Sequence, residues 1–436
     1  MSSTSNSEKR GLFATFMQGL SKIEPNELKA TFASFAFVFI LMAAYYILKP
    51  VRDSMASEWS DAEVATLWTI NLFVTLGMNV LYSLALSVAR LKVVVPALYG
   101  FFAASFVIFA FGSDFFSDTD LVNKAFYVWI SMFALFHISV FWSFMADLFN
   151  KEQAKRLFGF IATGASVGGL VGPAVAVLLA GKLGNDGLMV IAALMIVLVI
   201  PTIAYLERLK VTELHNEAVS GTPVKQTLGG NPFAGFTLLI KSPFLLGIAV
   251  FLFFYTSLGS FIYFELKNLL APYAAETRTQ IQSGINLAIN VFTILTAIVA
   301  TSRLTTRFGL SVTLALIPVM MIGGLLAVSV IASVWIVVFL QVAFKSGNYA
   351  ITRPGREMLF TLVDRETRFK TKPVIDTLVY RAGDTLNAWS FTALSEGLGL
   401  GMSALAIVGA VIAGAWAVLA MFLGRAYHRD KAQSAP

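Results

Sequence analysis

Long apolar runs with few charges recur along the whole chain, and each is about as long as a bilayer is thick. A helix needs about 20 apolar residues to cross the hydrocarbon core. The runs predict spans at 30–49, 64–88, 93–112, 121–148, 157–181, 187–206, 243–268, 279–302, 309–330, 332–351, 374–397 and 402–424. Only helices and closed barrels satisfy their backbone groups in lipid. The pattern therefore predicts an all-α membrane protein of about twelve transmembrane helices.

Composition narrows the possible chemistry. Charged residues make up 13% of the chain and hydrophobic residues 57%, whereas a soluble domain carries about 25% charge. The chain has no cysteine, and its histidines, His137, His215 and His428, lie in different segments. We expect no metal site, no cofactor and no catalytic cluster, which makes a membrane-embedded enzyme an unfavoured alternative.

Lysine and arginine predict the orientation. With both termini cytoplasmic, cytoplasmic segments hold 24 of these residues and the opposite side holds 5. Cytoplasmic loops carry the excess of positive charge. We therefore expect a multi-pass protein of the bacterial inner membrane, and the same bias accounts for much of the net charge of +7 without a nucleic-acid partner.

The chain reads as two similar halves. The sequence YYILK at 45–49 recurs as YFELK at 263–267, and NLFVTL at 71–76 recurs as NVFTIL at 290–295. Matches in the same order at a near-constant offset predict a duplicated six-helix bundle. The expected organisation is a cytoplasmic tail, a bundle, a linker, a second bundle and a second tail, at 1–29, 30–206, 207–242, 243–424 and 425–436.

Parallel six-helix repeats joined by a central loop are typical of the major facilitator architecture. The segment SRLTTRFG at 302–309 resembles the loop motif of that superfamily, and its first-half counterpart at 89–92 is degenerate. An alternative interpretation of both segments is ordinary positive charge on cytoplasmic loops.

Charged residues inside spans indicate function, because they are costly in lipid unless they are paired or line a wet cavity. The predicted substrate-binding residues are basic: Lys49, Arg52, Lys267, Lys345 and Arg381. Arginine binds phosphate or carboxylate with two parallel hydrogen bonds, and lysine offers a point charge. Such a set suits an anionic small molecule. Snorkelling to the headgroups is the alternative for Lys49, Arg52 and Lys267.

Acidic residues near these cations have two possible roles. Asp53, Glu265, Asp376 and Asp384 could couple transport to protons or pair with a neighbouring base. Asp384 lies three residues after Arg381, which favours a pair on one helical face. Asp147 lies near the cytoplasmic end of its span and is expected to pair with loop bases such as Lys151. On the fifth span, Gly164, Gly168, Gly169 and Gly172 predict close helix packing.

Three blocks resemble one family of carriers. They are YILKPVRDS at 46–54, FWSF at 141–144 with EQAKRLF at 152–158, and RPGREMLF at 353–360 with KPVIDTLVYRAGD at 372–384. They resemble the ATP/ADP antiporter family of bacteria and plastids, in particular its shorter bacterial branch.

That resemblance implies nucleotide exchange, with a functional first-helix base at Arg52. One position departs from the family: its intramembrane glutamate falls on Ile130 here. The expected function is alternating-access transport of an anionic solute, with a nucleotide as the candidate that the resemblance implies. The alternatives are a lipid or lysolipid flippase and a proton-coupled metabolite transporter on the same fold.

Overall fold

The computed structural model describes residues 23–88, 91–112, 117–216, 234–299 and 301–433, and within them it is helical and contains no strand. The all-α prediction is confirmed. The α-helices are α2 (Leu28–Met55), α3 (Asp61–Val88), α4 (Leu91–Ala110), α6 (Thr119–Leu148), α7 (Lys151–Thr212), α8 (Ala234–Lys241), α9 (Pro243–Leu270), α10 (Ala275–Val299), α11 (Thr301–Val330), α12 (Val334–Gly347), α13 (Arg353–Leu359), α14 (Arg365–Pro373), α15 (Tyr380–Thr392) and α16 (Met402–Gln433).

Short 3₁₀ and π segments join these helices. The 3₁₀ turns are η1 (Pro25–Glu27), η2 (Ala56–Glu58) and η5 (Phe360–Leu362), and the π segments are η4 (Asn348–Thr352), η6 (Val374–Val379) and η7 (Ala393–Gly397). The run from α14 to η7 is therefore one interrupted helical rod.

Twelve helical segments account for the twelve expected spans. Among the described residues, nine helices are long and apolar enough to cross a membrane. The longest of these, α7, has 62 residues and breaks at Gly184, whose φ of 66° is left-handed, so it supplies two spans. Helix α3 and the rod from α14 to η7 supply the remaining two in the described part of the chain.

Contacts divide the chain into two compact units. The first unit contains residues 1–52 and 77–226, and the second contains residues 53–76 and 227–436. The end of α2, η2 and the first half of α3 thus belong to the second unit, where η2 packs on α9. The division into two duplicated six-helix halves joined by a linker, which the sequence suggests, stays a prediction.

In the first unit, glycines let α7 approach the backbone of α2. A Cβ atom added at Gly164 would lie 2.6 Å from the carbonyl oxygen of Phe35, and one at Gly172 would lie 2.5 Å from that of Ala43. Gly168 meets Phe39 in the same way, one helical turn between the two. Any larger residue would push the helices apart, so the predicted small-residue packing face is confirmed.

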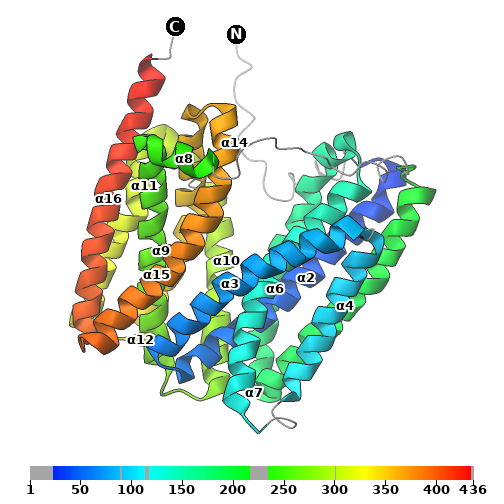
Figure 1. Cartoon of the computed structure of the whole chain (residues 1–436), viewed down its shortest axis with the longest axis horizontal. Helices are drawn as coiled ribbons and strands as arrows, with labels where there is room; N and C mark the ends of the chain where they lie inside the picture. Colours follow the sequence, from blue (N-terminus) through cyan, green and yellow to red (C-terminus); the bar gives the residue numbers. More distant parts are fainter. Residues whose placement is uncertain (1–22, 89–90, 113–116, 217–233, 300, 434–436) are drawn as a thin grey trace, which may run out of the picture. The chain divides into compact units, whose positions relative to one another are not determined.

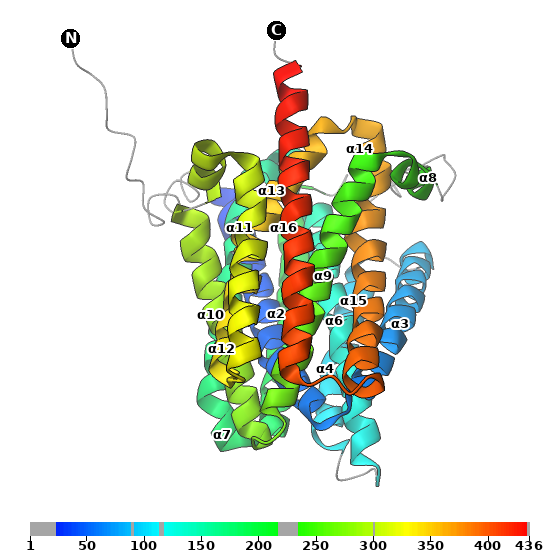
Figure 2. The same ribbon diagram turned by 90° about the vertical axis from the view of Figure 1, so that its left-hand side faces the viewer.

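In the second unit, long helices lie side by side around an apolar core. Helix α16 packs against α11 and α9, and α9 also packs against α15 (Figures 1 and 2). Buried leucine, isoleucine and aromatic side chains, with Trp416 the largest, fill the space between them. Large apolar residues such as Val330, Phe339 and Val411 remain exposed on the outside, where a bilayer would cover them.

The structure differs from the sequence interpretation at two places. The first span, expected to end at residue 49, continues in α2 through Pro50 to Met55. Residues 352–373, expected as a loop, are largely helical in α13 and α14. The degenerate motif at 89–92 begins at residues 89–90, which lie outside the described residues, while its second-half counterpart contains Gly309 with a φ of 77°, so the helix breaks there.

Candidate functional site

Arg52 is the best-anchored predicted cation of the first unit. One guanidinium nitrogen donates to the Ser131 hydroxyl at 3.1 Å, and the group lies 5.3 Å from the ring centroid of Tyr127. Ser131 in turn donates to the carbonyl oxygen of Tyr127 at 2.8 Å. Helix α6 therefore orients the fork of Arg52, which stays partly exposed and able to meet a ligand.

Lys49 lies one turn before Arg52 on the same helix. Its ammonium is 5.9 Å from the centroid of the Tyr46 ring, and its side chain is also partly exposed. The neighbouring Tyr45 stacks on His137 of α6 with the two centroids 4.9 Å apart. The two predicted cations of the first unit are thus on one helix beside aromatic rings.

His137 was not singled out from the sequence. It is 2% exposed, its Nδ1 lies 2.8 Å from the carbonyl oxygen of Phe133, and its ring stacks on Phe133 as well as Tyr45. A lone histidine gives no spacing signal, so only the packing of α2 on α6 reveals that it supports Tyr45.

In the second unit, Lys345 and Asp384 belong to one electrostatic cluster. Lys345 interacts with Asp384, Asp53, Tyr255 and Tyr349. Asp384 also interacts with Arg381, the partner expected from the spacing. The side chains of Lys345, Arg381 and Asp384 are all partly exposed. The structure thus joins two predicted cations with two predicted acids in what we call the Lys345 cluster.

Tyrosines and π segments shape the Lys345 cluster. Tyr255 stacks on Phe344 at 5.0 Å and lies 6.3 Å from Tyr380. The π segment η4 starts three residues after Lys345 and contains Tyr349, and η6 ends directly before Tyr380. Such π bulges are rare and frequently occur at functional sites, because they re-aim the side chains that follow.

Lys267 has different partners. It is 2% exposed, forms an ion pair with Asp61 at 2.9 Å and donates to the carbonyl oxygen of Trp59 at 2.7 Å. Three further groups contact Asp61: Asn268 and Ser395 donate to its carboxylate, and Glu396 accepts from its backbone N–H at 2.6 Å. We call these five residues, Asp61, Lys267, Asn268, Ser395 and Glu396, the Asp61 cluster.

A second ion pair holds the chain just before Asp61, at Ser54 and Glu58. Arg278 of α10 pairs with Glu58 at 2.6 Å and donates to the carbonyl oxygen of Ser54, while the Ser54 hydroxyl donates to the carbonyl oxygen of Ala275. Residues 54–61 are therefore fastened to both α9 and α10. These contacts favour a structural role for Lys267, whose predicted role in substrate binding stays a prediction.

Other acids have partners remote in the sequence. Asp376 pairs with Arg356 at 2.9 Å, which links η6 to α13. Asp147 pairs with Lys210 at 2.6 Å, a base of the expected 207–242 linker, instead of with Lys151, the base named as the example. Lys210 reaches Asp147 because the end of α7 returns to the end of α6, a contact that local spacing cannot predict.

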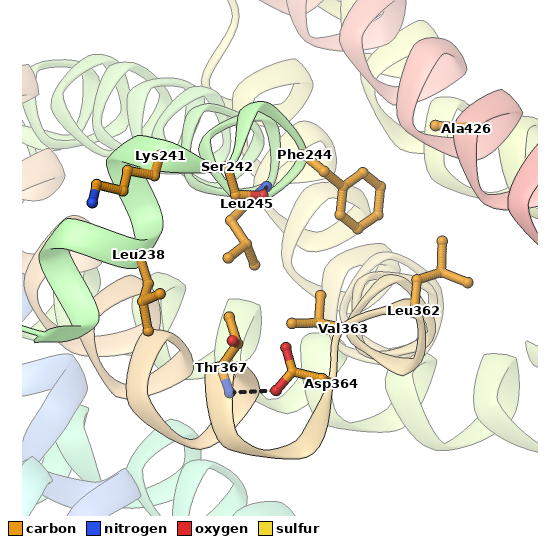
Figure 3. A pocket seen from close by; sticks show the side chains of 10 residues that line it. All are labelled: Leu238, Lys241, Ser242, Phe244, Leu245, Leu362, Val363, Asp364, Thr367 and Ala426. Carbon is orange, nitrogen blue, oxygen red and sulfur yellow. Dashed lines mark hydrogen bonds between the residues drawn. The ribbon is translucent and has the colours of Figure 1, made fainter.

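A cavity of about 550 Å³ lies at one end of the second unit, between α8, the start of α9 and the start of α14 (Figure 3). Leucine, valine and phenylalanine supply five of the ten lining residues, and the Lys241 ammonium points away from the cavity. The backbone N–H of Thr367 donates to Asp364, which lowers the pKa of that carboxyl below its ordinary value. Lys241 is the single cation among the lining residues, and because its ammonium is turned away the cavity does not present a positive charge to an anion.

Comparison with known proteins identifies the fold. The family described as Major Facilitator Superfamily matches residues 31–363. The chain belongs to the Major Facilitator Superfamily. Membership of this superfamily indicates that the major facilitator protein is a transporter rather than an enzyme. Among the described residues, no group of three or more histidine, aspartate and glutamate side chains could hold a metal ion.

Solved structures support the same fold. The nucleoside transporter NupG aligns with a TM-score of 0.62 and 13% identity, covering 93% of this chain and 99% of that chain. A bacterial homologue of the human lysosomal transporter Spinster aligns with a TM-score of 0.61 and 13% identity, covering 93% and 98% of the two chains. At this identity the likeness shows the fold alone. No curated protein sequence matches this major facilitator protein.

Proposed function

We propose that this protein is a secondary transporter of an anionic organic solute, and that nucleotides of the ATP/ADP type are its first candidate substrates. The observation that carries the proposal is the set of partly exposed cations beside tyrosines in each unit: Lys49 and Arg52 in the first, Lys345 and Arg381 in the second. A charged residue inside a membrane span that remains accessible is, as a first hypothesis, part of a functional site. The family resemblance of the blocks around Arg52 and Arg381 supports the nucleotide.

Alternating access is the proposed mechanism. The two six-helix halves, 30–206 and 243–424, would move against each other around a central site, as in other transporters built from repeats. The excess of lysine and arginine in alternate loops supports cytoplasmic termini and placement in the inner membrane of a bacterium. The acid that the family has at position 130 is an isoleucine here, fully buried beside Ser131, so that position gives the nucleotide assignment no support.

Ligand-dependent thermal stability tests the class of substrate. We expect ATP or ADP to raise the melting temperature of the purified protein, whereas uncharged adenosine should not, because the cations bind the phosphates. A ligand at 100 times its dissociation constant stabilises the folded state by about 2.7 kcal/mol. Lys345→Gln should lose most of this effect, and Lys241→Gln, at the apolar cavity, should keep it.

Two outcomes would contradict the proposal. An equal shift with adenosine would show that charge is not recognised. A shift produced by a lysolipid and by no soluble anion would favour the flippase alternative.

A further inference from the structure

Glu265 is a buried acid for which the described residues supply no hydrogen-bond partner. It lies near the end of α9, its exposed fraction is 1%, and neither carboxylate oxygen has a hydrogen-bond partner in the described part of the protein. Its helix is enclosed by α12, α15 and α16, and Figure 2 shows α9 passing beside α15 and α16. The proposed function leaves this residue unused.

The nearest base in the sequence does not neutralise Glu265. Lys267 lies two residues further along α9, and residues two apart do not face each other on a helix. Its ammonium already pairs with Asp61 and donates to the carbonyl oxygen of Trp59. Lys267 and Asp61 thus compensate one another and leave Glu265 alone.

Among the residues that the structure describes, the bases on the elements around α9 have acidic partners or lie far from Glu265. Helix α16 has no charged residue between Met402 and Gly424. Lys345 and Arg381 interact with Asp384, Arg278 pairs with Glu58, and Arg356 pairs with Asp376. Glu396 accepts from the backbone of Asp61. Lys241 is 24 residues before Glu265, about 36 Å along a helix.

An ionised carboxylate in this position would be strongly destabilising. Removing an unpaired charge from water costs several kcal/mol, and such a group neutralises instead. A protonated carboxyl costs far less, since only a hydroxyl and a carbonyl then need partners. The burial and isolation of Glu265 therefore favour its neutral form.

We propose that Glu265 is a proton-binding site that is filled in this conformation and empties in another. The proton comes from water to one carboxylate oxygen and returns to water when a rearrangement lets solvent reach α9. No electron moves and no other reactant takes part. Low pH favours the conformation that binds the proton more tightly. The difference in proton affinity between the two conformations therefore links proton binding to the transport cycle. The proposal goes beyond the proposed function and holds for any solute.

Infrared spectroscopy of the reconstituted protein at neutral pH tests the site directly. We expect a band from a protonated carboxyl group that is lost in Glu265→Gln, whose amide imitates the neutral acid in shape. Glu276→Gln is the matched control, because Glu276 is exposed at the start of α10 and should be ionised. Equal melting temperatures would show that both variants fold.

The spectra decide the proposal without any knowledge of the substrate. A carboxyl band unchanged by Glu265→Gln would overturn it, even if nucleotide exchange were observed. Exchange of labelled ATP, if found, should change with pH in the unaltered protein and lose that dependence in Glu265→Gln. A pH profile that the substitution leaves intact would overturn the link to the transport cycle.

Discussion

Replacing Asp61 by alanine should destabilise the protein by about 3–5 kcal/mol, because it leaves the buried Lys267 ammonium without its counter-ion. The two side chains are 6% and 2% exposed, so water cannot take the place of the carboxylate. The same change removes the acceptor of Asn268 and Ser395. The measurement is thermal unfolding of the purified protein in detergent.

Two controls isolate the buried charge. Asp120→Ala removes the acid of an exposed ion pair with Lys124, whose N–O distance is 2.6 Å and in which Asp120 is 55% exposed. This change should lower the free energy of unfolding by less than about 1 kcal/mol. Adding Lys267→Met to Asp61→Ala should restore much of the lost stability, since no unpaired charge remains. If Asp61→Ala melts with Asp120→Ala, the Asp61 cluster does not hold residues 54–61.

Replacing Arg52 by alanine should abolish exchange while the protein stays folded. Hydrogen bonds to a charged group contribute about 1.5–3 kcal/mol each, so the loss of one alone lowers affinity by roughly 10- to 150-fold. Arg52 is held by Ser131 and Tyr127, which fix its planar fork. Arg52→Lys should recover only part of the rate, because lysine keeps the charge and loses the fork.

Lys124→Ala is the matched control for lost positive charge in the first unit, since Lys124 pairs with Asp120 four residues before it on α6. Its exchange rate should remain close to that of the unaltered protein. Full activity in Arg52→Ala, or equal loss in Lys124→Ala, would contradict the role given to Arg52.

The sequence predicts the fold well because each membrane span depends on the local composition of about twenty residues. Twenty apolar residues suffice to indicate each rod, and the glycine spacing on α7 indicates its packing face on α2. Composition does not predict the segment boundaries: helices α13 and α14 replace an expected loop, since charged, polar stretches can be helical when neighbouring helices support them.

The partners of buried charges were largely beyond prediction. Lys267 pairs with Asp61, 206 residues earlier in the chain, and Asp147 pairs with Lys210. The Arg381–Asp384 interaction could be predicted, because the two residues lie three apart on one helical face. The π segments beside Lys345 and Tyr380 carry no sequence signature either, because they depend on how the rods pack.

Counterflow in proteoliposomes tests most directly whether this protein exchanges nucleotide anions. Vesicles loaded with unlabelled ADP, and empty vesicles as the comparison, are offered labelled ATP. Our account predicts uptake only with internal nucleotide, inhibited by external ADP and not by adenosine. Uptake that ignores the internal nucleotide, or none at all from protein shown to be folded by its melting curve, would contradict it.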